Sequence, residues 1–220
     1  MTEQPAAPIS VLLVDDHRMF AESMARLLSD DADITVQGIA LTGSQAIEMI
    51  AQVRPQVVLV DYLVPDIDGV EITQQIKRAD PTIMVVMLTG SADDRVLLAA
   101  IEAGCSGFLT KDRAAAEVAD AVRAAAAGEA LISPALLARL LPKLNPTHRA
   151  IGSDLTEREH EILVLLAKGW TNRVIADDRH LSINTIRNYV QSVLIKLGAH
   201  SKLEAVATAV REGLIDPAGR

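Results

Sequence analysis

The sequence predicts an α/β fold, a doubly wound sheet of five parallel strands, followed by a small all-α domain of four helices. Over residues 1–127, short runs of Val, Leu and Ile alternate with helical patterns. From Leu155 onward the pattern is helical throughout. Near-continuous apolar strands between helices are typical of a parallel sheet that helices cover on both faces.

The strands and helices of the first part follow one another in five strand–helix units. Strands are expected near residues 9–14, 34–39, 56–61, 83–88 and 106–109. Helices are expected near residues 17–29, 43–53, 69–78, 93–103 and 113–127. Residues 1–127 therefore form the first predicted domain.

Residues 128–152 are predicted to be a partly helical linker, because Gly128, Pro134, Pro142 and Pro146 interrupt them. A short helix fits between two of these prolines, over residues 135–141. Residues 153–220 form the second predicted domain, in which Thr156–Glu159 and Ser201–Glu204 are both capping boxes. Its four helices are expected to begin near Thr156, Thr171, Ser182 and Ser201, and to end near Gly169, Asp178, Leu197 and Gly213.

The composition excludes several classes of protein. Half of the 220 residues are hydrophobic, which excludes a disordered chain, and no apolar stretch approaches the roughly 20 residues that span a bilayer. Residues 1–10 contain no basic residue, so we expect no signal peptide, and Cys105 alone cannot form an internal disulfide. A cytoplasmic protein without a membrane partner is expected.

The charge is unevenly distributed between the two predicted domains. Residues 1–148 carry 11 Lys and Arg against 20 Asp and Glu, a net charge of −9. Residues 149–220 carry 10 against 9, a net charge of +1. This asymmetry favours an acidic first domain and a second domain that can approach a polyanion.

Polar side chains stand where four of the predicted strands end. Asp15 and Asp16 follow the first strand, Asp61 follows the third, Thr89 ends the fourth, and Lys111 comes just after the fifth. The carboxyl ends of parallel strands share one edge of a sheet, where ligands bind. Each of these residues taken alone is better explained as a helix cap or a solvated loop residue than as part of a binding site. Polar residues at the ends of four strands together favour a binding site. Carboxylates suit Mg²⁺, and a metal ion with a lysine allows an aspartate to accept a phosphoryl group.

Residues 9–127 resemble the flavodoxin-like receiver domain of response regulators. The family pattern is an acidic pair after strand 1, a phosphorylated Asp after strand 3, Thr or Ser after strand 4, and Lys after strand 5. The resemblance implies that a sensor histidine kinase phosphorylates Asp61. Val64 and Asp112 depart from the Met and Pro that are frequent in the family, and neither departure removes a chemical group.

The resemblance also assigns roles to the other residues of the site. Asp16 and Asp61 would bind Mg²⁺ directly, and Asp15 would bind it through water. The Leu63 backbone carbonyl would complete the metal ligands. Lys111 would contact the phosphoryl group, Thr89 would move toward it, and Phe108 would be the switch aromatic.

The stretch from Ser182 to Leu197 predicts a helix with one apolar face and one polar face. The sharp turn at 179–181 after a preceding helix predicts a helix-turn-helix. Polar side chains of these types can contact base edges and phosphates, although periodicity alone fits a small helical bundle with a solvated face equally well. The polar face carries Asn184, Thr185, Arg187, Asn188, Gln191, Ser192 and Lys196.

Residues 155–176, 182–190 and 196–205 strongly resemble the LuxR-type helix-turn-helix, so nearly the whole chain resembles the NarL/FixJ response regulators. In this family the helix from Ser182 enters the major groove, and the final helix, 202–212, dimerises. Ordinary core packing of that helix is the alternative. Arg179 replaces the usual core Leu, and Ile195 a frequent basic residue. Expected base or phosphate contacts are Arg187, Asn188 and Gln191, and expected backbone contacts are Thr171, Asn172, Arg173, Thr185 and Lys196.

We therefore expect a transcription regulator of a two-component system rather than an enzyme. Phosphorylation of Asp61 would control homodimerisation and binding to double-stranded DNA, and RNA polymerase would be a further partner. One alternative is a constitutive DNA-binding protein whose receiver is vestigial or responds to a ligand. The other is a phosphatase, which would commonly place an Asp where Leu63 stands.

Overall fold

The computed structural model describes residues 7–89, 93–111, 115–143 and 155–216. The chain divides into two compact units, which are described separately. The first comprises Met1–Ser91 and Phe108–Ala127, and the second comprises Ala92–Gly107 and Gly128–Arg220. Among the described residues, no helix is both long and apolar enough to cross a membrane.

A five-stranded parallel sheet forms the centre of the first unit, as the sequence predicts. Its strands lie in the order β2-β1-β3-β4-β5. Residues Val11–Val14 of β1 and Val57–Val60 of β3 are almost completely buried, which explains their continuous apolar sequence. The strands are β1 (Ile9–Val14), β2 (Ile34–Ala40), β3 (Val57–Asp61), β4 (Met84–Thr89) and β5 (Gly107–Thr110).

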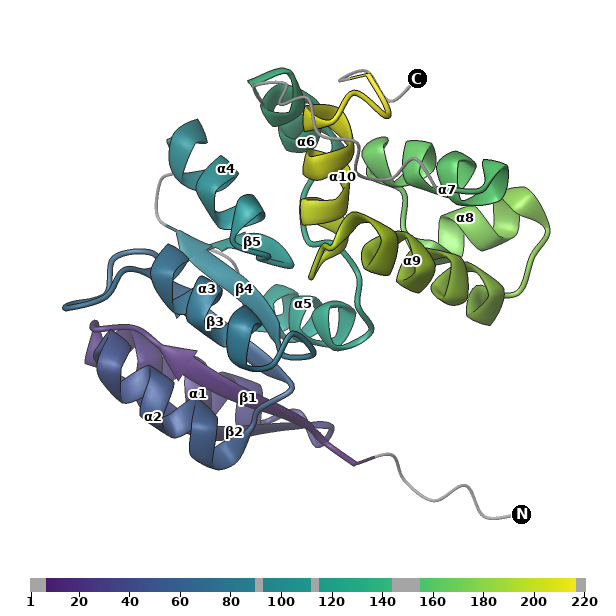
Figure 1. The fold of residues 1–220 in the computed structure, drawn as a ribbon. Helices are drawn as coiled ribbons and strands as arrows, with labels where there is room; N and C mark the ends of the chain where they lie inside the picture. Colours follow the sequence, from purple (N-terminus) through teal and green to yellow (C-terminus); the bar gives the residue numbers. More distant parts are fainter. Residues whose placement is uncertain (1–6, 90–92, 112–114, 144–154, 217–220) are drawn as a thin grey trace, which may run out of the picture. The chain divides into compact units, whose positions relative to one another are not determined.

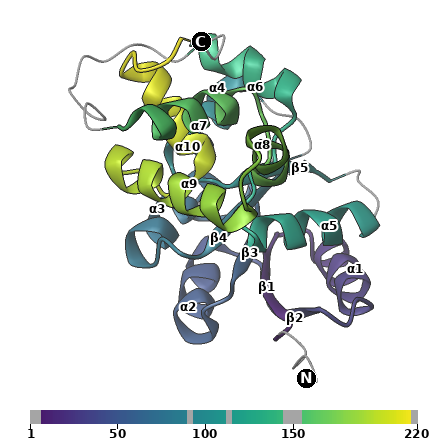
Figure 2. The same ribbon diagram turned by 90° about the vertical axis from the view of Figure 1, so that its right-hand side faces the viewer.

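Helices cover both faces of this sheet. Helices α2 (Gly43–Val53) and α3 (Gly69–Ala79) pack together on one side, and α1 (Arg18–Ser29) and α5 (Ala115–Ala126) pack together on the other (Figure 2). Thr42 and Asp68 cap the N-termini of α2 and α3. The expected helix 113–127 is confirmed from Ala115, and residues 113–114 lie outside the described part of the chain.

The second unit is helical, and its four C-terminal helices follow one another as predicted (Figure 1). The capping box at Thr156 is confirmed, because the Thr156 and Glu159 side chains bond to each other's backbone amides. Ser201 also caps its helix, but the Glu204 carboxylate accepts from the His200 amide at 2.6 Å. The helices are α4 (Asp94–Glu102), α6 (Pro134–Leu140), α7 (Glu157–Ala167), α8 (Asn172–Arg179), α9 (Ile183–Leu197) and α10 (Lys202–Arg211), with a 3₁₀ turn at Leu141–Lys143.

Helix α10 is buried on nearly all sides. Of its ten residues, only Glu204 and Arg211 are partly exposed. It contacts α7, α9 and α4, and at its two ends Ser201 Oγ donates to the Cys105 carbonyl at 2.9 Å and Arg211 pairs with Glu102 at 3.3 Å. Its buried residues include Lys202 and Thr208 as well as the apolar side chains.

The Glu159 carboxylate joins α7 to α9. It is buried and accepts from the Thr156 amide at 2.7 Å and from Lys196 Nζ at 2.7 Å, and Ser192 Oγ also donates to it. Burial raises the pKa of Glu159, but hydrogen bonds from Lys196, Ser192 and Thr156 outweigh it and lower the pKa to about 2. The carboxylate therefore stays charged and fixes the position of α9.

We predict that Glu159→Gln destabilises the protein by about 3 kcal/mol at pH 7, because the pKa of this group is lower in the folded state than its usual 4.5. Such a group stabilises the fold above pH 4.5, and its contribution is lost as pH falls toward 2. Urea unfolding followed by circular dichroism at several pH values measures the difference, which should narrow below pH 4.5. The exposed Glu157→Gln is the control. A difference that does not change with pH would contradict the assignment.

Gly69, the first residue of α3, lies against the backbone that carries Asp61. A Cβ atom at Gly69 would lie 2.5 Å from the Asp61 carbonyl oxygen and 3.0 Å from Tyr62 Cα. Its amide donates to the Tyr62 carbonyl at 3.0 Å. Only glycine allows α3 to begin this close to the end of β3.

We predict that Gly69→Ala lowers the free energy of unfolding by about 1–3 kcal/mol, because backbone atoms must move to admit the methyl group. Chemical denaturation measures this, with Ala51→Ser on the exposed surface of α2 as the control for one added atom. Wild-type stability of the Gly69→Ala protein would show that the turn after β3 is not tightly fixed.

Candidate functional site

Acidic side chains meet where β1 and β3 end. Asp15 and Asp61 are 1% and 4% exposed, and Asp16 lies beside them at the surface. One ligand atom from each of Asp15, Asp16, His17 and Asp61 lies within 4.8 Å of the others. The predicted grouping of the three aspartates is therefore present, and His17 joins it.

Lys111 connects the two buried carboxylates. Its Nζ lies 2.7 Å from Asp15 Oδ2 and 2.7 Å from Asp61 Oδ2. Burial lowers the pKa of Lys111, but the two carboxylates outweigh this effect and raise the pKa above its usual range. The ammonium is therefore charged, and it also lies 5.1 Å from the centre of the Phe20 ring.

The cluster suits a hard divalent cation. Three carboxylates face one ammonium, so the aspartates retain excess negative charge and lone pairs for a metal ion. Mg²⁺ prefers one or two carboxylates together with water and phosphate oxygens. His17 Nδ1, which lies 2.8 Å from Asp16 Oδ1, is the one nitrogen among these ligand atoms. The residues present fit Mg²⁺ at Asp16 and Asp61.

The remaining predicted residues of this site are placed as follows. Thr89 ends β4, and its side chain lies outside the described part of the structure. Phe108 is half-buried in β5, and the Leu63 side chain, in the turn after Asp61, is 71% exposed. Their roles, and that of the Leu63 carbonyl, stay predictions. Asp112 lies outside the described residues.

The turn after β3 is fixed by a carboxylate that does not belong to the cluster. Asp66 has a φ of 70° and accepts from the amides of Gly43 at 2.8 Å and Ser44 at 3.1 Å. A hydrogen bond from the Ser44 side chain, followed by those from the Ser44, Gly43 and Ile67 amides, holds the pKa of Asp66 below its usual range. These hydrogen bonds attach the turn to the start of α2. They therefore restrict the conformations of the loop that follows Asp61.

Helix α9 of the second unit presents most of the predicted polar face, but Ser192 and Lys196 are half-buried and bond to Glu159. Ile186, Val190, Val193 and Leu197 are buried, which fixes the rotation of the helix. The opposite face exposes Asn184, Arg187, Asn188 and Gln191, with Thr185 half-buried beside them. This face has hydrogen-bonding groups and a positive charge at the spacing of one helix surface.

The residues expected to contact a DNA backbone differ in accessibility. Thr171 and Arg173 are exposed, but Asn172 is only 2% exposed, and its amide donates to Glu129 Oε2 at 3.3 Å. Lys196 is paired with Glu159, as described above. Arg179, which replaces a core Leu of the family, is exposed at the end of α8, so this departure leaves no buried charge.

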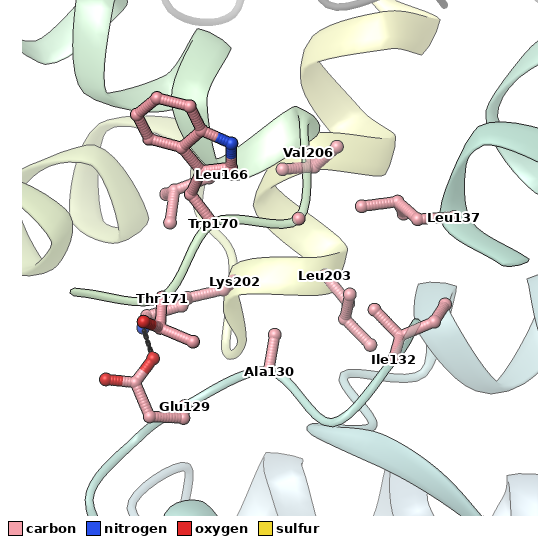
Figure 3. Close-up of a pocket in the computed structure, with 11 residues that line it drawn as sticks. Glu129, Ala130, Ile132, Leu137, Leu166, Trp170, Thr171, Lys202, Leu203 and Val206 are labelled. Atoms are coloured by element: carbon pink, nitrogen blue, oxygen red, sulfur yellow. Dashed lines mark hydrogen bonds and ion pairs between the residues drawn. The ribbon is translucent and has the colours of Figure 1, made fainter. Parts of the chain in front are cut away.

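Glu129 was not predicted as a functional residue, and neither was its partner Lys202. Figure 3 shows their side chains joined at one end of a pocket, with Trp170 and Val206 at the other. The two charged groups lie 2.7 Å apart. Because they are 73 residues apart in the sequence, no local pattern indicates this pair.

Comparisons with known proteins match two parts of the chain. Residues 11–123 match the response regulator receiver domain, and residues 153–209 match the luxR family of bacterial regulatory proteins. Response regulator protein VraR of Staphylococcus aureus is 38% identical over 207 residues, which cover 94% of this chain and 99% of VraR.

Solved structures of response regulators are similar to this chain. The crystal structure of ChrA, a response regulator of a heme-sensing two-component system, is 31% identical, covers 95% of this chain and 100% of ChrA, and has a TM-score of 0.51. RcsB of Salmonella typhimurium shares the fold at 23% identity, with 90% and 97% of the chains covered and a TM-score of 0.56. The chain therefore belongs to the two-component response regulators in which a receiver domain precedes a LuxR-type helix-turn-helix domain.

Proposed function

We propose that this response regulator is a transcription factor that phosphorylation of Asp61 switches between two states. Its receiver would span residues 1–127, its linker 128–152 and its DNA-binding domain 153–220. The observation that carries the proposal is the position of the Lys111 ammonium, which forms ion pairs with both Asp15 and Asp61 beside Asp16. A sensor histidine kinase would supply the phosphoryl group.

The geometry supports phosphoryl transfer to the Asp61 carboxylate. Asp61 keeps one oxygen on Lys111, and its other oxygen is available to attack phosphorus. The Lys111 ammonium would stabilise the negative charge on the phosphoryl oxygens. Mg²⁺, held by Asp16 and Asp61 with Asp15 acting through water, supplies the second positive charge when it is bound.

Transfer of the phosphoryl group to Asp61 would change the ion pairs that Lys111 forms with Asp15 and Asp61. The new phosphoryl oxygens compete with the carboxylates of Asp15 and Asp61 for the same ammonium. Thr89 and Phe108, on β4 and β5, are the residues that we propose respond to this change. A ligand that stabilises one of two states in this manner shifts their populations.

The response would be homodimerisation and DNA binding. Helix α10 is the proposed dimerisation helix, and its burial against α4 supports an unphosphorylated state in which that surface is covered. RcsB, which shares the fold, has been solved as dimers bound to DNA. Dimers would place two α9 helices in successive major grooves, and RNA polymerase would be a further partner in the cytoplasm.

The family is generally non-enzymatic, and we propose the same for this chain. A phosphatase that works through an aspartyl-phosphate needs an acid–base group near the nucleophile. Two residues after Asp61 stands Leu63, whose apolar side chain is exposed and has no such group. Sustained hydrolysis of small phosphoesters is therefore not expected.

We predict that Asp61→Asn abolishes phosphorylation by acetyl phosphate, because the amide cannot form an acyl phosphate. Phosphate-affinity gel electrophoresis with and without Mg²⁺ measures this, and chelation of Mg²⁺ should have nearly the same effect on the wild type. Asp30→Asn, at an exposed position after α1, is the matched control. Equal phosphorylation of the Asp61→Asn protein would place the phosphoacceptor elsewhere.

We predict that Arg187→Ala weakens binding to DNA fragments selected from the source genome by about ten- to a hundredfold, as expected for loss of a base or phosphate contact. Fluorescence anisotropy with a phosphoryl mimic present measures the affinity. Arg158→Ala, an exposed arginine of α7 paired with Glu161, is the control for net charge. Unchanged affinity would remove α9 from the proposed DNA interface.

A further inference from the structure

An anion from the linker occupies the start of helix α8. Glu129 lies between α5 and α6, and its Oε2 atom is 2.7 Å from Lys202 Nζ and 3.3 Å from the Asn172 amide nitrogen (Figure 3). The Lys202 side chain is 4% exposed and that of Glu129 is 16% exposed. All three residues belong to the second compact unit.

The groups around this carboxylate form an anion-binding site. Asn172 is the first residue of α8, where amides lack partners within the helix and carry a partial positive charge. The preceding Thr171 side chain accepts from the Val174 amide, so it leaves the Asn172 amide to Glu129. The side-chain oxygen of Asn172 only accepts hydrogen bonds, so the group of Asn172 that binds this anion is the backbone amide.

The buried ammonium is the second, independent part of the site. Lys202 is the first residue of α10, far from Asn172 in the sequence. Its ammonium donates to Glu129 Oε2, the same oxygen that accepts from the Asn172 amide. Burial lowers the pKa of Lys202, Glu129 opposes this shift, and the charge of Arg187 adds to it. A buried ammonium without an anionic partner is costly, so Lys202 requires an anion.

The position of the site indicates which anion would replace Glu129. In a helix-turn-helix the first helix crosses the DNA backbone, and helix N-termini and lysines contact phosphates. Thr171 and Arg173 are exposed on either side of Asn172, and Arg187 of the proposed recognition helix acts electrostatically on Lys202. A backbone phosphate has the charge and the acceptor oxygens that the carboxylate now provides.

We propose that Glu129 occupies a DNA phosphate site formed by the Asn172 amide and Lys202, and that the linker carboxylate competes with the DNA backbone for it. This inference rests on the DNA-binding function proposed above. When Glu129 leaves, the Asn172 amide and the Lys202 ammonium become free to bind one DNA phosphate. That phosphate then supplies the negative charge that the Lys202 ammonium needs. The linker thereby weakens DNA binding through a backbone contact, separately from the base contacts of α9.

The test compares the unphosphorylated full-length wild type with Glu129→Gln, which keeps the shape of the side chain and removes its charge. DNA affinity is measured by fluorescence anisotropy at several salt concentrations, on the operator selected with the phosphoryl mimic. We expect about tenfold tighter binding, within the usual range of coupling between two sites. The slope of log K against log salt should steepen by about one, because each neutralised phosphate adds about 0.9.

Two further variants keep the result specific. Adding Lys202→Met to Glu129→Gln should remove the gain in slope, because the second cation of the site is lost. Glu157→Gln, which removes an exposed carboxylate of α7 in the same unit, should leave affinity and slope unchanged. Circular dichroism melting curves verify that each variant is folded.

Every outcome decides the proposal. Tighter binding without a steeper slope would overturn the phosphate site, because release of the linker alone would then explain the gain. Wild-type affinity of Glu129→Gln would overturn it as well. If the wild type with the phosphoryl mimic also fails to bind any DNA, the proposed function itself fails; if it binds, only the role of Glu129 is lost.

Discussion

The charge balance among Asp15, Asp61 and Lys111 is the constraint on which the receiver depends. Two carboxylates at the ends of separate strands are almost completely buried, and a single ammonium neutralises part of their charge. Buried groups of like charge remain ionised only when opposite charge or hydrogen bonds compensate them. The order of the strands places β1 beside β3, so the carboxyl ends of both strands, and hence both aspartates, meet at one edge.

Much of the fold could be predicted because its signals are local. Continuous apolar runs mark β1 and β3, and Thr42, Asp68, Thr156 and Ser182 mark helix starts through hydrogen bonds that span three residues. The acidic site was also predictable, because the ends of parallel strands share one edge. The incomplete capping box at Ser201 could not be predicted. The sequence does not show that the Glu204 carboxylate accepts a hydrogen bond from the His200 amide rather than from the Ser201 amide.

The residues that the sequence does not reveal are those whose partners lie far along the chain. Glu159 binds Lys196 across 37 residues, and Glu129 binds Lys202 across 73. A single glutamate in a linker or on a helix has no periodicity, so its burial becomes visible only after folding. His17 gave a weak signal through its position directly after the acidic pair. Lys196 had a polar-face position that suggested a DNA contact, although its nearest anion belongs to its own domain.

The sole tryptophan of the chain lines the same pocket as Glu129 and Lys202. Trp170 is partly exposed and lies between the end of α7 and the start of α8, and it lines the same pocket as the linker residues Ala130 and Ile132 (Figure 3). Indole emission shifts to longer wavelength as water gains access to the ring. The chain thus contains an intrinsic fluorophore at the place where linker and DNA-binding domain meet. Its emission wavelength would report their separation in real time without any attached dye.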